Sequence, residues 1–600
     1  MALPHFNSHT LADWKSRLTK GRSIPRLTPF ESLLYSFSPA ERFVLYTLSI
    51  FLALSCFVLV VGVARSFSVV IPARGGSITE GEIGPVRFIN PILTLSSADE
   101  DLTSLVYSGL MRATPDGTYV PDLAQSYVVS ENGTVYTFKL RPEAVFHDGT
   151  PVTSADVVFT VQLAQNPSIK STHQADWAGV RVSAPDQHTV VFTLPHSYAP
   201  FLDNATLGIL PKHEWENVSD EEFPFSPLNT HPIGSGPYKV TNIMTDSTGS
   251  ATRYELEPFS KYVGGRPYLD GITFVFYPNE DALVKAFNAG SVQAIAGIDP
   301  EDVSSLKHSG ARILSVPLPR VFGVFFNQGK NPVFSDPSVR EALESAVDKQ
   351  SLVNNVLHGY GTVLNGPIPP GIIENAPQMD ATNVPAPTVA TTSIVTPTNI
   401  TAAQATLQRA GWKFDPNTER WVKGKQTLAF TLATADEPEL VATANDLATA
   451  WRAAGIPVTV QIYPLSDLNT NVLRPRDYDA ILFGQVVGRT ADLFAFWHSS
   501  QRNDPGLNLA LYANAHADQL LTEARGDADP EDRTKLYSQF AKIVEKDRPA
   551  LFLYSPDFLY VVPDGLRGVQ LGALTNPAER FLNARLWYTE TARVWEALAR

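Results

Sequence analysis

The chain has 600 residues, of which 44% are hydrophobic and 10% aromatic, with a net charge of −14. This length exceeds what one hydrophobic core supports, so we expect several folded domains rather than a disordered chain. The acidic balance argues against nucleic-acid binding, which needs a basic face, and at most mildly favours cationic ligands. The single cysteine, Cys56, excludes an internal disulfide and a cysteine-based zinc site.

The first predicted element is an uncharged apolar segment over residues 43–64. As a helix with a rise of about 1.5 Å per residue, it would span roughly 33 Å, enough for a hydrocarbon core. More basic residues precede it than follow it, which predicts a retained anchor with a cytoplasmic N-terminus. Residues 1–42 would then be a cytoplasmic tail, and everything after the segment would lie outside, in the periplasm or at the cell surface. The lipid bilayer is therefore an expected partner, through residues 43–64.

After residue 75 the hydrophobic periodicity alternates between helical and strand-like, which predicts an α/β body. Apolar residues three and four apart predict helices over Asp99–Met111, Ser154–Gln165, Asn279–Ala289, Ser338–Asp348, Ala402–Ala410, Glu437–Ala454, Ala515–Ala524 and Glu531–Lys546. Shorter apolar or alternating runs predict strands over Thr134–Leu140, Thr189–Leu194, Tyr254–Glu257, Ile272–Val275, Arg320–Asn327, Thr427–Ala433, Pro457–Ile462 and Ala480–Gly484.

One passage combines three of these signals. Residues 136–141 alternate as a strand, Asp148-Gly149 supplies a tight turn, and Thr153 or Ser154 can cap the helix that follows. The amino-acid sequence of this passage resembles the signature of the family 5 extracellular solute-binding proteins, the dipeptide and oligopeptide receptors of ABC importers. Further passages resemble members of that family in the same order: residues 75–79, 105–110 with 121–126, 233–239, 287–293, 326–349, 406–412 and 454–458.

The resemblance covers about residues 73–590 and implies a two-lobed fold of the type II periplasmic-binding kind, with an extra subdomain in the first lobe. Lobe 1 would hold residues 73–318 plus 545–600, with its inserted subdomain at about 117–231. Lobe 2 would hold residues 319–544. Hinges would fall near 316–322 and 548–554, where prolines limit the freely rotating residues.

Enzyme motifs are missing from the sequence. There is no Walker motif, dinucleotide fingerprint, Gly-x-Ser-x-Gly elbow or His-Glu-x-x-His pair. His213-Glu214 lacks a second histidine, and His147 is better explained as a turn residue before Asp148 than as part of a catalytic triad. We therefore expect no enzyme activity, no catalytic residues, no cofactor and no metal site.

The ligand site implied by the resemblance is a cleft with apolar and aromatic walls and a few polar groups. Its candidate residues come from a loop after the first strand, the Gly-Ser-Gly turn, one strand of lobe 2, and the segment 481–497. They are Phe88, Asn90, Gly234, Ser235, Phe325, Phe326, Asn327, Phe483, Gln485, Val487, Arg489 and Trp497, with Trp177 as a weaker candidate. For each aromatic the alternative is ordinary core packing, and one of Phe325 and Phe326 must face the core because neighbours on a strand alternate.

The segment 483–494 departs from the peptide-binding members. These usually carry an Asp here that pairs with the peptide α-amino group, and the corresponding position falls near Val487 or Gly488. Arg489 follows instead and could meet a carboxylate or phosphate, or be a solvated charge at the rim. Asp492 is expected to cap the next helix. Recognition of a free amine is therefore in doubt.

The resemblance implies a membrane-anchored receptor that binds dipeptides or oligopeptides in the cleft and delivers them to ABC permease subunits. Closure of two lobes around the ligand would be the mechanism. Three alternatives stay open: a receptor of the same fold for a sugar or an anionic solute, a signalling or surface module that does not take part in transport, and a hydrolase with its site in the cleft.

Overall fold

The computed structural model describes residues 36–307, 310–371, 393–489, 492–527, 529–572 and 574–595. By its internal contacts the chain forms two compact units. One unit contains residues 1–71 and 591–600, and the other, which we call the body, contains residues 72–590. Most of the predicted cytoplasmic tail, residues 1–42, lies outside the described residues.

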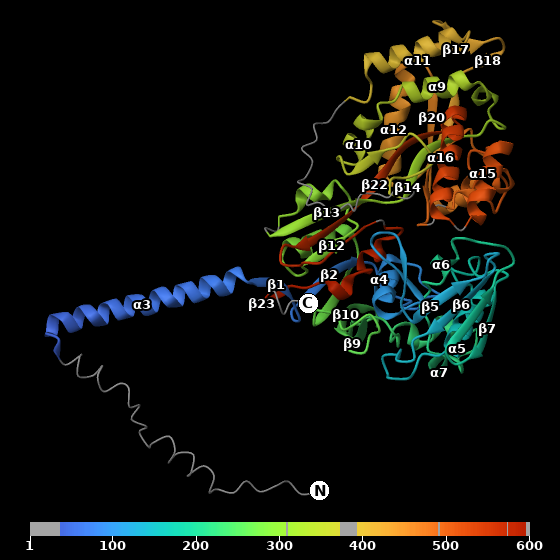
Figure 1. The fold of residues 1–600 in the computed structure, drawn as a ribbon. Coiled ribbons are helices and arrows are strands. Elements are labelled where there is room, and N and C mark those ends of the chain that lie inside the picture. The colour runs from blue at the N-terminus through green and yellow to red at the C-terminus, as the bar shows by residue number, and fades with distance from the viewer. Residues whose placement is uncertain are drawn as a thin grey trace. The chain divides into compact units, whose positions relative to one another are not determined.

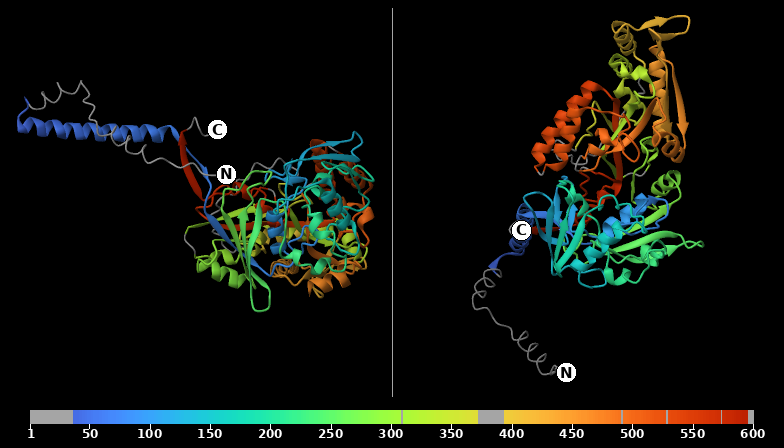
Figure 2. Two further views of the ribbon diagram at one scale, coloured as in Figure 1. Left: turned by 90° about the horizontal axis from the view of Figure 1, so that it is seen from below. Right: turned by 90° about the vertical axis from the view of Figure 1, so that its right-hand side faces the viewer.

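In the first unit, one long helix contains the predicted apolar segment. Helix α3 (Pro39–Ser66) has 28 residues, and an 18-residue window within Pro39–Val60 has a mean hydropathy of 2.5. By length and composition it can cross a membrane, and its large side chains are exposed, as with Phe43 at 73%. Strand β1 (Ser68–Ala73) follows and pairs with β23 (Glu590–Trp595), as the left view of Figure 2 shows.

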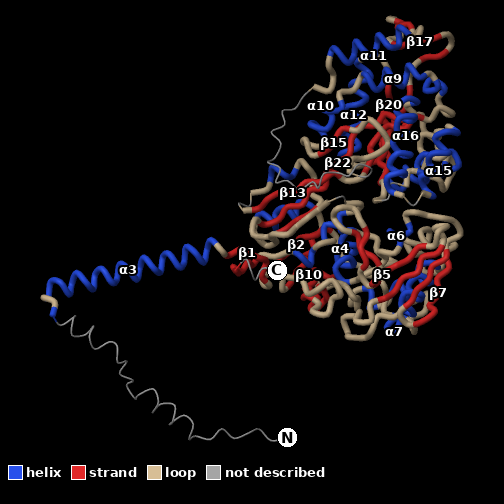
Figure 3. The backbone as a smooth tube through the Cα atoms, in the orientation of Figure 1, coloured by secondary structure: helices blue, strands red, loops and turns tan. Residues whose placement is uncertain are grey.

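The first part of the body builds a small sheet and one edge of a large one. Strands β5, β6, β8 and β7 form the small sheet in that order, with α5 against it (Figure 3). The helices here are α4 (Ser97–Val106), α5 (Ser154–Gln165), α6 (Phe201–Asn204), α7 (Lys212–Trp215) and α8 (Glu280–Asn288). The strands are β2 (Ser77–Ile83), β3 (Met111–Ala113), β4 (Tyr119–Pro121), β5 (Ala124–Val129), β6 (Val135–Leu140), β7 (Arg181–Asp186), β8 (Thr189–Thr193), β9 (Tyr238–Thr245), β10 (Ala251–Pro258), β11 (Gly271–Tyr277), β12 (Ala294–Ala296) and β13 (Ala311–Pro317).

The second part of the body is a sheet with helices packed against it (Figure 1). Its helices are α9 (Pro337–Ser345), α10 (Lys349–Val356), α11 (Pro397–Arg409), α12 (Pro438–Ala453), α13 (Leu465–Asp467), α14 (Phe494–Trp497), α15 (Ala515–Gly526) and α16 (Pro530–Asp547). Its strands are β14 (Arg320–Phe326), β15 (Gly361–Val363), β16 (Lys413–Asp415), β17 (Arg420–Lys423), β18 (Gln426–Thr427), β19 (Phe430–Ala435), β20 (Val458–Tyr463) and β21 (Ala480–Val486).

One strand joins the two parts. The large sheet runs β20-β19-β21-β14-β22-β12-β2-β11-β10-β9, and β22 (Ala550–Pro563) is central to it. The first residues of β22 pair with β14, in the register Phe325 to Ala550, and its last residues pair with β13, in the register Ala311 to Pro563. A single extended segment therefore carries the backbone hydrogen bonding from one part to the other.

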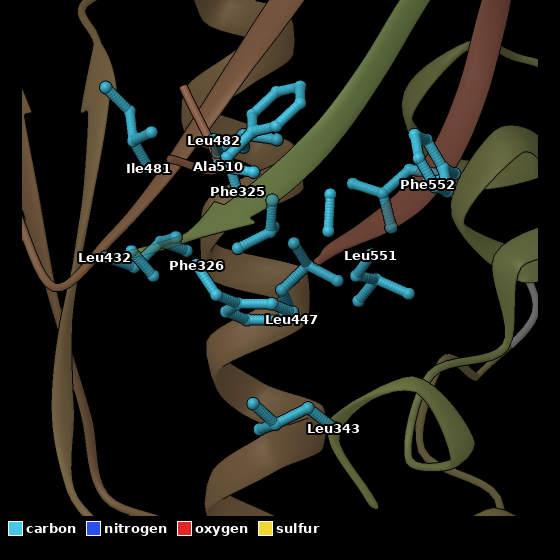
Figure 4. Close-up of a cluster of buried hydrophobic side chains, with 14 of the residues drawn as sticks. Phe325, Phe326, Leu343, Leu432, Leu447, Ile481, Leu482, Ala510, Leu551 and Phe552 are labelled. Carbon is cyan, nitrogen blue, oxygen red and sulfur yellow. The ribbon is translucent and has the colours of Figure 1, made fainter. Parts of the chain in front are cut away.

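The hydrophobic cores divide at the same place. One cluster contains buried residues between Ile78 and Leu318 and between Phe558 and Trp587, and another contains buried residues between Val321 and Tyr554. We call residues 77–318 with 556–590 the first lobe and residues 319–555 the second lobe. Figure 4 shows part of the second core, where Phe325 and Phe326 lie among leucines from α9, α12 and β22.

Every helix and strand predicted in the body has a counterpart of the same kind, with ends that differ by a few residues. The helices predicted over Asp99–Met111 and Ala402–Ala410 differ most, since the first ends five residues earlier and the second begins five residues earlier than predicted. Helix α4 ends at Val106, and Tyr107 is already extended. At Gly109, just beyond this end, a Cβ would lie 2.4 Å from the carbonyl oxygen of Thr206, so the backbone here packs directly on another segment.

Candidate functional site

A cavity of about 510 Å³ lies where the two lobes meet. The first lobe supplies most of its wall, from α4, the loop after it, residues 173–177, residues 198–208 and the turn at 575–585. The second lobe supplies Gly488 and Asp492. Its polar and aromatic lining includes Glu100, Thr103, Ser104, Tyr107, Arg112, Asp122, His173, Asp176, Trp177, Tyr198, Asp203, Tyr262, Asn576, Glu579 and Arg585. This volume is typical of a site for a small ligand.

Helix α4 is fixed at both ends. At its start, Ser96 and Asp99 form a capping box, and Asp99 Oδ1 also accepts hydrogen bonds from the N–H groups of Arg87 and Phe88 at 2.8 and 2.9 Å. At its end, the N–H of Gly236 donates to Val106 O at 2.8 Å. The cavity-facing residues of α4 therefore sit on a rigid support.

A buried ionic cluster holds the turn at 575–585 against α4 and β2. Arg580 donates to Glu80 Oε1 at 2.9 Å and to Glu82 Oε2 at 3.3 Å, and it also pairs with Asp101. Tyr560 on β22 donates to Glu80 Oε2 at 2.8 Å. Burial, together with the charge of Asp101, raises the pKa of Glu82 well above its usual range. The cluster places Glu579 and Glu100, the sequence neighbours of Arg580 and Asp101, at the cavity.

Several cavity carboxyl groups are partly or fully buried. Burial raises the pKa of Asp203, although Tyr119 donates a hydrogen bond to its Oδ1 at 2.9 Å. Burial and then the nearby charge of Asp101 raise the pKa of Glu100. Burial likewise raises the pKa of Asp122, whose carboxylate accepts from the hydroxyl of Tyr262 at 3.1 Å. This end of the first lobe therefore concentrates acidic groups in a poorly solvated place.

One ion pair crosses from lobe to lobe at the cavity wall. Arg489 Nη2 of the second lobe lies 2.5 Å from Glu579 Oε2 of the first, with side chains 3% and 17% exposed. Glu579 is oriented by Thr575, whose N–H and hydroxyl both donate to it at 2.5 Å. Burial opposes the charge on Arg489, but Glu579 and Tyr119 raise its pKa. Arg489 therefore has a protein carboxylate as its partner.

A second arginine makes further contacts between the lobes. Arg525 pairs with Asp492 at 3.1 Å within the second lobe, and its guanidinium lies 5.4 Å from the centre of the Tyr198 ring of the first lobe. Its carbonyl oxygen accepts the N–H of Ala199 at 3.4 Å. Asp492 thus lines the cavity and orients Arg525, besides accepting the N–H of Phe494 at 3.3 Å in the manner of a helix cap.

The four main first-lobe candidates from the sequence, Phe88, Asn90, Gly234 and Ser235, do not line the cavity. Phe88 is half-buried against the first core, and Asn90 is fully buried with its side chain bonded to Asn229 at 2.9 Å. A Cβ on Gly234 would lie 2.0 Å from Val106 O, so this glycine lets the turn approach the end of α4. Ser235 is buried, and its Oγ has no partner among the described residues.

The second-lobe candidates also lie outside the cavity lining. Phe325, Phe326, Val487 and Trp497 belong to the second core, so both phenylalanines are buried, where alternation had suggested only one. Phe483 packs against the same core. Asn327 donates to Arg476 O at 3.0 Å and accepts two backbone N–H groups, as a turn residue does. Gln485 is buried, and neither of its amide atoms has a partner among the described residues.

The weaker candidate Trp177 and the residue Gly488 do line the cavity. The sequence analysis missed Glu100, Asp176, Asp203, Tyr107 and Glu579. They come from separate segments that only tertiary structure brings together. A signal was available for two of them, since Glu100 and Tyr107 fall on the polar side of a helix that the sequence predicts.

Asp148, His213 and Glu214 come together on the surface of the first lobe. His213 Nε2 lies 2.7 Å from Asp148 Oδ2 and 3.7 Å from Glu214 Oε1. Among the described residues this is the one group of three side chains with metal-ligand spacing. The ion pair alone accounts for the arrangement.

Comparison with known proteins decides the family. Residues 118–506 match the model of the bacterial extracellular solute-binding proteins, family 5, middle region. The chain belongs to this family. Family 5 proteins are transport receptors rather than enzymes, which confirms the prediction made from the resemblance. The chain therefore carries an extracellular solute-binding domain of the ABC-importer type.

This family 5 protein is similar over most of its length to known solute-binding proteins. It is 29% identical over 528 residues to the oligopeptide-binding protein AppA of Bacillus subtilis, covering 86% of this chain and 92% of AppA. The structure of that AppA in complex with a nonapeptide matches with a TM-score of 0.64 at 28% identity, over 86% of this chain and 99% of AppA. The ABC transporter substrate binding protein CtaP of Listeria monocytogenes matches with a TM-score of 0.69 at 25% identity, over 86% of this chain and all of CtaP. The predicted fold class is confirmed.

Proposed function

We propose that this protein is a membrane-anchored receptor that encloses a peptide in the cavity between its lobes and presents it to ABC permease subunits. The observation that carries the proposal is the cavity of about 510 Å³, walled by both lobes and lined by buried polar groups. Two of these groups, Thr103 Oγ1 and Tyr107 OH, have no hydrogen-bond partner among the described residues. Buried polar groups are normally satisfied, so a ligand that supplies partners would be stabilised here.

Lobe closure would follow from the connection between the lobes. Strand β22 and the short link between β13 and β14 join them, so a change in backbone angles near residues 318–320 and 554–557 would swing one lobe against the other. A ligand that touches Tyr107 on one side and Gly488 on the other would favour the closed arrangement. The name and ligand of the Bacillus subtilis relative support a peptide as the solute.

The membrane part of the proposal rests on α3. Its exposed apolar surface would be covered by lipid, with residues 1–42 on the cytoplasmic side and the body outside. Protease added to protoplasts or spheroplasts, in which the outer face of this membrane is accessible, should then digest the body and leave a short N-terminal fragment protected. Protection of the whole chain would contradict this topology.

The ligand is tested by native mass spectrometry of the full chain, purified in detergent from its own host. We expect a mixture of co-purifying peptides. The Ser104→Trp variant should be purified without bound peptide, because Ser104 lines the cavity and a tryptophan there would fill it. The control Glu131→Trp, in an exposed turn, should still co-purify with peptides. A sugar, or no ligand in any of the three proteins, would overturn the proposal.

A further inference from the structure

The charges that line the cavity are unevenly balanced. Three carboxyl groups have arginines close by: Asp122 interacts with Arg112, Glu579 pairs with Arg489, and Asp492 pairs with Arg525. The remaining three are Glu100, Asp176 and Asp203. Among the residues that the structure describes, none of these three forms an ion pair with lysine or arginine; Asp176 pairs with His173 at 2.9 Å.

The unbalanced carboxyl groups lie on one side of the cavity. Glu100 interacts electrostatically with His173 and Glu579. Asp203 interacts with Glu579 and Asp176, and also with Arg489, which already forms its ion pair with Glu579. The other cavity arginine, Arg585, interacts instead with Tyr262, beside Asp122 and Arg112. The cavity therefore has a basic side around Asp122 and an acidic side around Asp203.

A second observation, independent of the carboxyl groups, points to a ligand in this cavity. Tyr107, the extended residue directly after α4, is 5% exposed and lines the cavity, and its hydroxyl has no partner among the described residues. Burial also raises the pKa of the Tyr107 hydroxyl, so it stays a neutral hydrogen-bonding group. Glu100 and Asp203 lie in a poorly solvated wall, whereas Asp176 is 48% exposed. A positive charge from a ligand would offset the cost of burying the first two, because isolated buried charges are costly.

We propose that the cavity selects peptides with a basic side chain, and that Glu100, Asp176 and Asp203 bind the ammonium or guanidinium group. This inference rests on the proposed function, since it assumes a peptide in the cavity. Three carboxyl groups exceed what a single α-ammonium group neutralises. An acidic or purely anionic ligand would meet like charge there, so the structure favours the reverse of the anionic ligand that Arg489 suggested from the sequence.

The test compares tripeptides that differ in one side chain, titrated against the full chain after its own ligand has been removed. Ala-Lys-Ala should bind about tenfold or more tightly than Ala-norleucine-Ala, which lacks only the terminal ammonium group, because the charge-assisted hydrogen bonds of that group are lost. Ala-Glu-Ala should bind more weakly still. N-acetylated versions of the same peptides separate the side-chain charge from the α-amino group, and the preference for lysine should survive acetylation.

Variants then identify the carboxyl groups that bind the charged side chain of the peptide. Glu100→Gln and Asp203→Asn should each reduce the preference for lysine over norleucine, and asparagine can still accept the Tyr119 hydrogen bond, so the fold should hold. Glu131→Gln, the same chemical change in an exposed turn, is the matched control and should leave the preference intact. Thermal unfolding of every variant checks that it is folded.

The outcomes separate the two proposals. If the peptides bind but those with lysine, norleucine and glutamate have equal affinities, or if the affinity depends only on N-acetylation, the charge inference is overturned. The proposal that the protein is a peptide receptor is then unaffected. If Glu100→Gln and Asp203→Asn keep the full lysine preference, their assignment is overturned. If no tripeptide or longer peptide binds at all, the proposed function itself is wrong.

Discussion

Arg489 offers the sharpest test of how the lobes are held together. In Arg489→Met the apolar part of the side chain remains and the ion pair with Glu579 is lost. A hydrogen bond to a charged group contributes about 1.5–3 kcal/mol. Glu579 lines the cavity and keeps its two bonds from Thr575, so it is not left without partners, and we expect the lower end of that range. A loss of about 1.5 kcal/mol shifts the equilibrium between closed and open lobes roughly tenfold toward open.

Hydrogen exchange measured by mass spectrometry reports this shift in the protein without ligand. The Ala199 N–H donates to Arg525 O across the lobes, so segments around 197–199 should exchange about tenfold faster in Arg489→Met if opening limits their exchange. The matched control is Arg266→Met, which removes an exposed ion pair with Asp270 within the first lobe and should change nothing there. Unchanged exchange at 197–199 in Arg489→Met would refute the idea that this pair stabilises the closed arrangement.

Three further changes test the body. Arg580→Met should lower the free energy of unfolding by about 3–5 kcal/mol, because Glu80 and Asp101 would stay buried without their cation; chemical denaturation measures this, and a loss below about 1 kcal/mol would contradict it. Burial lowers the pKa of His147 from 6.5 to about 4, so the folded state binds fewer protons than the unfolded state between these values. The stability that His147 contributes is therefore complete above pH 6.5 and lost as the pH falls toward 4, and His147→Asn should reduce the difference in unfolding free energy between pH 6.5 and 4; an unchanged difference would argue against it. Gly234→Ala should destabilise the protein by about 2 kcal/mol or more because its Cβ meets Val106 O, while Gly488→Ala, with open space around it, should change the melting temperature little; equal effects would show that Gly234 has room.

The sequence predicted the fold far better than the cavity. Local signals are strong where a segment carries its own cap, as in Ser154–Gln165, where Thr153 and Asp156 form a capping box and the helix has the bounds predicted for it. They fail where a distant backbone decides the outcome, as at Gly109, where close packing on Thr206 accompanies the early end of α4.

The candidate site residues show the same limit. Residues near Phe325 and Trp497 have the aromatic character of a binding wall, but the same character fills a core, and the structure buries them. Asp176, Asp203 and Glu579 are ordinary surface acids in the sequence. Only the approach of three chain segments gives them a common cavity, and no pattern along one segment records that approach. Whether the twelve sequence candidates touch a ligand stays a prediction.

The pairing of β1 with β23 matters for anyone who wants the body without its helix. A shortened gene that starts after residue 73 would delete β1 and leave β23 with a free row of N–H and C=O groups. Such unpaired edges recruit other chains and promote aggregation. A version that begins just before Ser68 would retain the ribbon, and its expression as a monomer is the more promising starting point for crystallisation.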